Sequence, residues 1–309
     1  MTLGYDKALH MLAFDHRGSF AKGLFGFEGA LTAEQRERVS DTKRVIFEAF
    51  ERAVEQGASP ETSGLLVDEE FGTDVARRAR AGGFALAMPV EKSGQEEFDF
   101  EFGGEFGRHI EDFDSSFAKV LVRYNPDGDL ELNRRQAERL AFLGEWLHHR
   151  DRKFLFELLV PATAAQLESV GGDKSRYDTE IRPGLVVATI RELQELGVEP
   201  DIWKIEGLDA RSDCERAAAQ ARTDGRDGVT CIVLGRGADE AGVFHWLRQG
   251  AGVPGYIGFA VGRTLWWDEL KGYVAGTLSR DAAVERIAGN YLRMIDAYVA
   301  AEDAARAAA

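Results

Sequence analysis

Cysteine and histidine are both scarce in this sequence of 309 residues. The two cysteines, Cys214 and Cys231, match no zinc-ligand spacing and cannot build the disulfide framework of a small secreted protein. None of the six histidines pairs at HxH or HxxxH spacing on a predicted strand end, which argues against a zinc-dependent enzyme. Carboxylates holding magnesium stay open as an alternative. We expect a cytoplasmic protein without a metal or another cofactor.

Long apolar runs and an excess of basic charge are missing as well. No apolar segment approaches the roughly 20 residues of a membrane span, and the first residues lack the apolar stretch and cleavage site of a signal peptide. The 53 acidic residues outnumber the 38 basic ones, for a formal charge of −15. Such a surface argues against nucleic acid or an anionic membrane as a partner. A local basic pocket could still recruit a small anion.

Short apolar segments recur along the chain. They are rich in Val, Ile, Leu and Phe, as strands buried on both faces are. Eight predicted strands cover residues 10–15, 63–68, 83–90, 118–124, 153–160, 201–207, 229–235 and 255–262. The clearest amphipathic helices are predicted over 32–57, 131–150, 183–198 and 279–309.

The alternation of eight strands with helices, without a linker-like break, predicts a single (β/α)₈ TIM barrel over residues 1–309. A doubly wound sheet, the alternative, would place a three-glycine dinucleotide fingerprint after the first strand, and DHRGSF lacks it. Residues 94–114 and 171–181 are expected to form long loops, which in a barrel supply lids and substrate walls.

A lysine stands in the middle of the sixth predicted strand, in the segment DIWKIEGL (201–208). Strand alternation puts Lys204 and Glu206 on one face. If the inward faces of the neighbouring strands are the charged ones, Glu157 and Lys119 converge on Lys204. A lysine that is desolvated near a second cation loses its proton more readily, and its neutral amine attacks carbonyl carbon.

These residues predict a Schiff-base aldolase, with Lys204 as nucleophile and Glu157 as the acid/base group. Lys119, Asp15 and Glu206 complete the predicted catalytic set, the last two as orienting carboxylates. The structural alternatives are a strand-end lysine that reaches water and a salt bridge between Glu157 and a structural lysine.

The other predicted strand ends supply candidate substrate-binding residues, because a barrel builds its site at the carboxyl ends of the strands. They are His16, Arg17, Lys92 and Arg123. Asp68, Glu69 and Glu70 are interpreted as a solvated helix start, where acidic residues favour the helix dipole.

Two glycine–arginine turns, LGRGAD (234–239) and VGRTLW (261–266), follow the seventh and eighth predicted strands. Barrels frequently bind phosphate at this position, with backbone N–H groups and a helix N-terminus. The turns predict a phosphate site made of Gly235, Arg236, Gly237, Gly262 and Arg263. The alternative is an Arg263 that only bridges to a barrel carboxylate such as Asp68.

FELL, DIWKIE and GFAVGRTLW resemble the class I aldolases of the tagatose-1,6-bisphosphate type and their sulfofructose-phosphate relatives. The resemblance implies that Lys204 forms the Schiff base, that Glu157 is the acid/base residue and that Lys119 is a further active-site lysine. LAFDHRGSF, DIWKIEGL, IVLGRGAD and GFAVGRTLWWD resemble, over nearly the whole chain, the aldolase-like domain fused to 5-dehydro-2-deoxygluconokinase.

This second resemblance implies a role in inositol catabolism, in which 2-deoxy-5-keto-D-gluconate 6-phosphate is cleaved to dihydroxyacetone phosphate and malonate semialdehyde. The sequence departs from the tagatose-type pattern at His16, usually a glutamine, at Arg123, commonly an aromatic, and at Gly235–Gly237, where a serine-alanine-glycine turn is expected. These departures concern substrate identity. The alternative substrates are tagatose 1,6-bisphosphate and sulfofructose 1-phosphate, and the alternative to an enzyme is a non-catalytic barrel that binds a sugar phosphate. Assembly into a homo-oligomer stays open.

Overall fold

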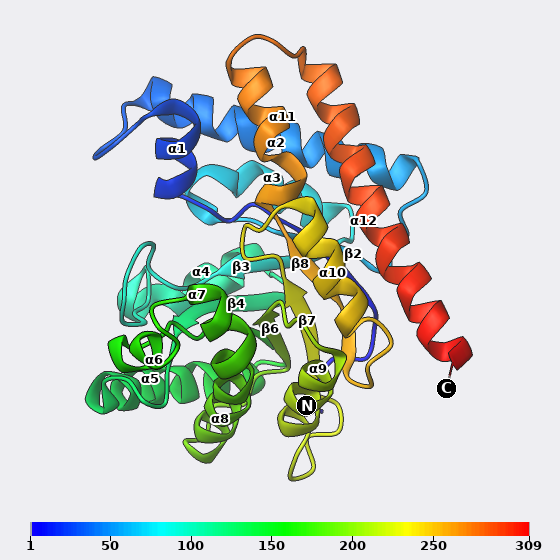
Figure 1. Cartoon of the computed structure of the whole chain (residues 1–309). Helices are drawn as coiled ribbons and strands as arrows, with labels where there is room; N and C mark the ends of the chain where they lie inside the picture. The colour runs from blue at the N-terminus through cyan, green and yellow to red at the C-terminus, as the bar shows by residue number, and fades with distance from the viewer. Residues whose placement is uncertain (1, 309) are drawn as a thin grey trace.

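Eight parallel strands close into a barrel in the computed structural model, which describes residues 2–308 (Figure 1). Each strand pairs with the next, and β8 pairs with β1. The strands are β1 (Leu9–Ala13), β2 (Ser63–Leu66), β3 (Ala85–Pro89), β4 (Phe117–Arg123), β5 (Lys153–Leu159), β6 (Ile202–Glu206), β7 (Thr230–Leu234) and β8 (Tyr256–Val261). Every one overlaps a predicted strand, so the predicted TIM barrel is confirmed.

Helices surround the barrel and fill its connections (Figure 1). They are α1 (Gly18–Phe25), α2 (Ala33–Glu55), α3 (Glu69–Ala81), η1 (Gly103–Glu105), α4 (Phe106–Phe113), α5 (Leu130–His148), α6 (Ala164–Ser169), α7 (Lys174–Arg176), the π-helical η2 (Tyr177–Ile181), α8 (Arg182–Glu195), α9 (Arg211–Ala221), α10 (Glu240–Gly250), α11 (Arg263–Val274) and α12 (Arg280–Ala308). None of these described helices combines the length and apolar character needed to cross a membrane.

The four predicted helices form at α2, α5, α8 and α12, although the last predicted residue, Ala309, lies outside the described part of the chain. α2 begins at a capping box: the Thr32 side chain accepts from the Gln35 N–H, and the Gln35 side chain accepts from the Thr32 N–H. α12 packs along α2 and closes that side of the barrel (Figure 1). Its Tyr291 donates a hydrogen bond of 2.6 Å to the carbonyl of His10 on β1.

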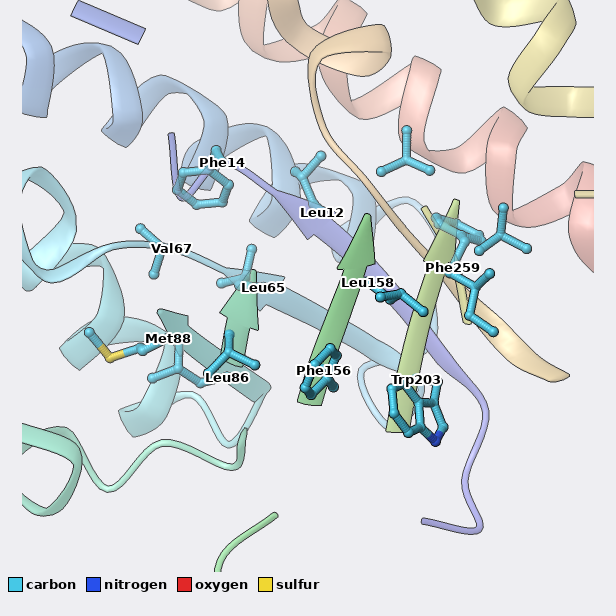
Figure 2. Packing of buried hydrophobic residues seen from close by; sticks show 14 of the residues in the cluster. Leu12, Phe14, Leu65, Val67, Leu86, Met88, Phe156, Leu158, Trp203 and Phe259 are labelled. Carbon is cyan, nitrogen blue, oxygen red and sulfur yellow. The ribbon is translucent and has the colours of Figure 1, made fainter. Parts of the chain in front are cut away.

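The barrel separates two apolar cores. Side chains on the outer face of the strands pack against the helices, among them Leu12, Leu65, Leu86, Phe156, Trp203 and Phe259 (Figure 2). The inward apolar side chains fill the interior of the barrel, among them Leu9, Met11, Leu66, Ala87, Phe117, Leu155, Ile202 and Ile232. Farther along the same inward rows, towards the carboxyl ends, the side chains become charged.

Two segments predicted as loops are partly helical, which corrects the sequence analysis. Within 94–114, Phe106, Ile110 and Phe113 recur on one buried face of α4, and this pattern outweighs the acidic, glycine-rich composition of the segment. Within 171–181, Asp173 accepts hydrogen bonds from the N–H groups of Ser175 and Arg176 and starts α7. That residues 1–309 form one domain stays a prediction.

Candidate active site

The inward rows of β5 and β6 place Glu157 beside Lys204. The two residues are paired in the strand register, and the Lys204 Nζ lies 2.9 Å from the Glu157 Oε2. Only 3% of the Lys204 side chain is exposed. The inward face of the strands is therefore the charged one, and a buried lysine is held by a buried carboxylate on a rigid sheet.

Lys119 on β4 is the centre of a ring of carboxylates. Its Nζ lies 2.7 Å from the Glu91 Oε1, 2.9 Å from the Asp15 Oδ2 and 3.0 Å from the Glu157 Oε2. Because Lys204 binds the same Glu157 oxygen, the two ammonium groups are close neighbours bridged by one atom. The predicted convergence of Lys119, Glu157 and Lys204 is thus present, with Asp15 beside them.

The charges of this cluster oppose the effect of burial. Burial lowers the pKa of Lys119, but Asp15, Glu157 and Glu91 outweigh it and raise that pKa well above its usual value. Burial raises the pKa of Glu157, but Lys119 and then Lys204 lower it below its usual value. The pKa of Asp15 is lowered in the same way, chiefly by Lys119. Lys119 is therefore a fixed cation beside the ionised Asp15 and Glu157, whereas burial raises the pKa of Glu91.

A cavity of about 850 Å³ opens above the cluster at the carboxyl ends of the strands. It is lined by every predicted site residue except Glu206, namely Asp15, His16, Arg17, Lys92, Lys119, Arg123, Glu157, Lys204, Gly235, Arg236, Gly237, Gly262 and Arg263. This size suits a small polar ligand, in the range of ordinary ligand pockets.

Glu206 has a different contact from the one the sequence suggested. Its Oε1 lies 2.7 Å from the Arg236 Nε, and its Oε2 accepts from the Val160 N–H at 3.0 Å. Arg236 also pairs with Asp178 at 2.8 Å. Glu206 therefore holds Arg236 over the rim of the barrel instead of orienting Lys204.

The two glycine–arginine turns meet at one edge of the cavity. Gly237 has a positive φ of 72°, and a side chain there would collide with the Arg263 guanidinium. α11 begins at Arg263 without a side-chain cap on its first N–H groups. Thr264 ties the turns together by donating to the Ala238 carbonyl at 2.8 Å. An uncapped helix start beside two arginines is suited to an anion.

Arg263 and Asp68 are not partners in this structure. Asp68 is buried in an ion pair with Lys43 of α2 and caps α3 by accepting from the Phe71 N–H. Within residues 2–308 the Arg263 side chain has no ion-pair partner, and it faces the cavity. The alternative in which Arg263 bridges to Asp68 is therefore wrong. The interpretation of Asp68 as part of a helix start is confirmed, but its predicted exposure to solvent is wrong, because Asp68 is fully buried in its pair with Lys43.

The remaining predicted binding residues line the cavity but differ in exposure and in hydrogen-bond partners. Arg17 is buried, and its terminal nitrogens bind the Glu101 carboxylate at 2.9 Å and the Glu91 carbonyl at 2.7 Å, so it fastens the loop after β3. Lys92 is exposed. Arg123 donates to the Gln95 carbonyl at 2.9 Å. His16 packs edge-on against Trp266, and burial lowers its pKa to about 4, so its ring is neutral near pH 7.

Sequence reasoning missed the role of Glu91. Glu91 directly follows the third predicted strand (83–90), but its neighbours in the sequence assign it no function. The signal was the alternation itself: Ala85 and Ala87 face the inside of the barrel, and Glu91 keeps the same parity. Lys43 was missed because it lies on a helix, and only the fold brings it to Asp68.

Residues 4–302 match the family described as "Uncharacterized protein conserved in bacteria (DUF2090)". The chain is similar to the tagatose 1,6-diphosphate aldolase of Listeria monocytogenes serovar 1/2a, with 29% identity over 213 residues, 66% of this chain and 57% of the relative. It is also similar to tagatose 1,6-diphosphate aldolase 1 of Enterococcus faecalis, with 24% identity over 63% of this chain and 56% of the relative. The chain thus spans just over half the length of these curated relatives.

Solved structures share the fold. A Schiff-base-forming fructose-1,6-bisphosphate aldolase superposes with a TM-score of 0.55 at 16% identity, covering 94% of this chain and 93% of the other. A protein of Corynebacterium glutamicum gives a TM-score of 0.60 at 17% identity, covering 96% and 88%. An archaeal fructose 1,6-bisphosphate aldolase gives 0.58 at 15% identity, covering 95% and 94%.

Proposed function

The chain belongs to the DUF2090 family, and we propose that it is a class I aldolase that cleaves a phosphorylated ketose through an imine on Lys204. One observation carries this proposal: a nearly water-free Lys204 lies 2.9 Å from a carboxylate that it shares with a second lysine, at the floor of a cavity. A structural ion pair needs one cation for Glu157, whereas imine chemistry needs an amine, an acid/base carboxylate and a fixed cation together.

The reaction follows from these positions. The neutral Lys204 amine attacks the ketone carbon, and the carbinolamine loses water to give a protonated imine. This imine accepts the electron pair of the broken carbon–carbon bond as an enamine, while the adjacent hydroxyl loses its proton and becomes the aldehyde. Protonation of the enamine and hydrolysis of the imine release the second product and restore the lysine. In this proposal Glu157 carries the protons at Lys204, and Lys119 stabilises developing negative charge.

The phosphate of the substrate is assigned to the edge of β7 and β8. Among the described residues, 2–308, none forms a competing ion pair with Arg263 there, and the uncapped N-terminus of α11 adds backbone donors. Arg236 is held by Glu206 and Asp178 and still lines the cavity. Binding energy gained at this remote phosphate positions the reacting carbon over Lys204.

For the substrate itself, 2-deoxy-5-keto-D-gluconate 6-phosphate is the first candidate, followed by tagatose 1,6-bisphosphate and sulfofructose 1-phosphate. The curated relatives named as tagatose 1,6-diphosphate aldolases support a ketose phosphate. Lys92 and Arg123, on the opposite wall from the phosphate turns, suit a substrate with a second anionic end. A place in inositol catabolism depends on the first of these substrates.

A non-catalytic sugar-phosphate sensor is the alternative from another class. A sensor would use the glycine–arginine turns, but it has no need of two lysines on one buried carboxylate. The presence of Lys119, Glu157 and Lys204 in one cluster favours the enzyme.

The test measures the release of dihydroxyacetone phosphate from each of the three candidate substrates in the presence of EDTA. A coupled reductase that consumes dihydroxyacetone phosphate reports this release. The proposal predicts EDTA-resistant release from at least one of them, and a loss of that release in Lys204→Met. Arg263→Ala should weaken the binding of the phosphorylated substrate, with little change in the Tm of the protein. EDTA-sensitive activity restored by a divalent ion, or full activity in Lys204→Met, would contradict it.

A further inference from the structure

Three buried polar atoms on the wall of the cavity lack hydrogen-bond partners within residues 2–308: the His16 Nδ1, and the Glu91 Oε2 and Arg17 Nε, which belong to two neighbouring side chains. Both side chains are only 8% exposed. Buried polar groups in folded proteins are almost always paired, because an unpaired one forfeits its hydration. Two unpaired atoms in neighbouring cavity-lining residues therefore indicate a place where a ligand group binds.

The rest of each side chain is fixed. The Glu91 Oε1 binds the Lys119 Nζ at 2.7 Å, and the terminal nitrogens of Arg17 bind Glu101 and the Glu91 carbonyl. The Arg17 Nη2 lies 3.9 Å from the Glu91 Oε1, so the two groups are neighbours. What is left is one acceptor on Glu91 and one N–H donor on Arg17.

We propose that Glu91 and Arg17 form a subsite for a hydroxyl group on the half of the substrate that leaves as the aldehyde. A hydroxyl can donate to the Glu91 Oε2 and accept from the Arg17 Nε–H at once. A phosphate or carboxylate would face the unpaired Glu91 oxygen, and an ammonium would meet Arg17 and Lys119. The residue chemistry thus selects a neutral group that is both donor and acceptor.

The position of Glu91 assigns the hydroxyl to the aldehyde half, and this step rests on the proposed function. The phosphate turns follow β7 and β8, Lys204 lies on β6, and Glu91 follows β3 on the far side of Lys119. A substrate with its phosphate at Arg263 and its carbonyl at Lys204 therefore extends its other half towards Glu91. The hydroxyl next to the new aldehyde is the group that this geometry selects. Tagatose 1,6-bisphosphate and sulfofructose 1-phosphate carry this hydroxyl, whereas 2-deoxy-5-keto-D-gluconate 6-phosphate lacks it, so the subsite favours the first two over the candidate that resemblance ranks first.

The test compares two aldehydes in condensation with dihydroxyacetone phosphate: glyceraldehyde 3-phosphate and its analogue without the 2-hydroxyl. The wild type should favour the hydroxylated aldehyde by about 10- to 100-fold in kcat/KM, because the analogue leaves buried polar groups unpaired. Glu91→Met, which fills the same space without an acceptor, should bring this ratio close to one. Glu91→Ala serves as the second variant if Glu91→Met does not fold.

Asp15→Asn is the matched control, because Asp15 also binds Lys119 but at a different place. It should slow both aldehydes by the same factor and keep their ratio. A wild-type ratio near one, or an equal loss for both aldehydes in Glu91→Met, would overturn the proposal and leave Glu91 as an anchor of Lys119. Borohydride trapping of the dihydroxyacetone phosphate imine, measured alongside, reports separately on the proposed function: its absence in the wild type would reject the aldolase and not the subsite alone.

Discussion

Glu157 is the residue on which the two lysines converge, since one of its oxygens binds both ammonium groups. Its pKa is low despite burial because these charges favour the carboxylate. A carboxylate in this position can take a proton from the attacking amine and return it when water leaves the carbinolamine. Within residues 2–308 the Asp15 carboxylate pairs with Lys119 and not with Lys204, so it lacks this access to Lys204.

Glu157→Gln should therefore form the imine but turn over about 10²- to 10⁴-fold more slowly, because the amide cannot exchange protons. Single-turnover kinetics with trapping would separate the two steps. Glu206→Gln is the control, since Glu206 contacts Arg236 and not Lys204. Normal turnover in Glu157→Gln would assign proton transfer to another carboxylate.

Removal of the fixed cation gives a pH prediction. Lys119 is the largest charge that lowers the pKa of Glu157 against its burial. In Lys119→Met the Glu157 pKa rises, so the carboxylate becomes protonated at a higher pH. The acid limb of the pH–rate profile should therefore shift to higher pH. Lys22 is an exposed lysine that lines the same cavity, and Lys22→Met should leave the acid limb in place. An unshifted acid limb in Lys119→Met would show that ionisation of Glu157 does not set this limb.

At the scale of elements, α2 is tied to the active end of β1 by one buried lysine. The Lys43 ammonium pairs with Asp68 and donates to the carbonyls of Phe14 and His16, at 2.9 and 3.0 Å. These carbonyls flank Asp15. Lys43 thus holds the turn that presents Asp15 to Lys119, and Asp68 connects the same turn to the start of α3.

Lys43→Met should lower the free energy of unfolding by about 3 to 5 kcal/mol, because it leaves the buried Asp68 charge unpaired. Urea unfolding followed by circular dichroism measures this. Lys43→Met combined with Asp68→Asn should recover part of the loss, since the unpaired charge is then gone. Equal stability of Lys43→Met and the wild type would contradict the role of this pair.

Much of the barrel could be predicted from the sequence because its strands are short, apolar and buried on both faces. The inward placement of Lys204 and Glu157 followed from alternation once the strands were located, since a period of two leaves only one choice of face. α4 and α7 were missed because their few apolar or capping residues lie within acidic, glycine-rich stretches.

Contacts between distant segments were beyond sequence reasoning. Nothing near Glu206 in the chain indicates that it binds Arg236, 30 positions later, or that Asp178 joins them. The pairing of Lys43 with Asp68 likewise depends on how α2 packs over the barrel. Strand parity predicts that a side chain points into the barrel, but the ion-pair partners of that side chain depend on the closed fold.

At the scale of the whole molecule, the net charge of the chain is negative, whereas the side chains at the proposed substrate-binding points are positive. The chain carries a formal charge of −15, whereas Lys92, Arg123, Arg236 and Arg263 line one cavity. This contrast concentrates favourable potential for an anionic substrate at the carboxyl end of the barrel. The fold, the cavity and the buried lysine pair thus point to the same end of the molecule.

The central claim is that Lys204 forms an imine, and borohydride trapping tests it most directly. The protein is incubated with dihydroxyacetone phosphate and borohydride, and the adduct is located by peptide mass spectrometry. We predict one ligand-dependent adduct per chain on Lys204, its absence in Lys204→Met, and loss of activity only when ketone and borohydride are both present. An adduct on Lys119 or another lysine, or no adduct at saturating ketone, would contradict the account.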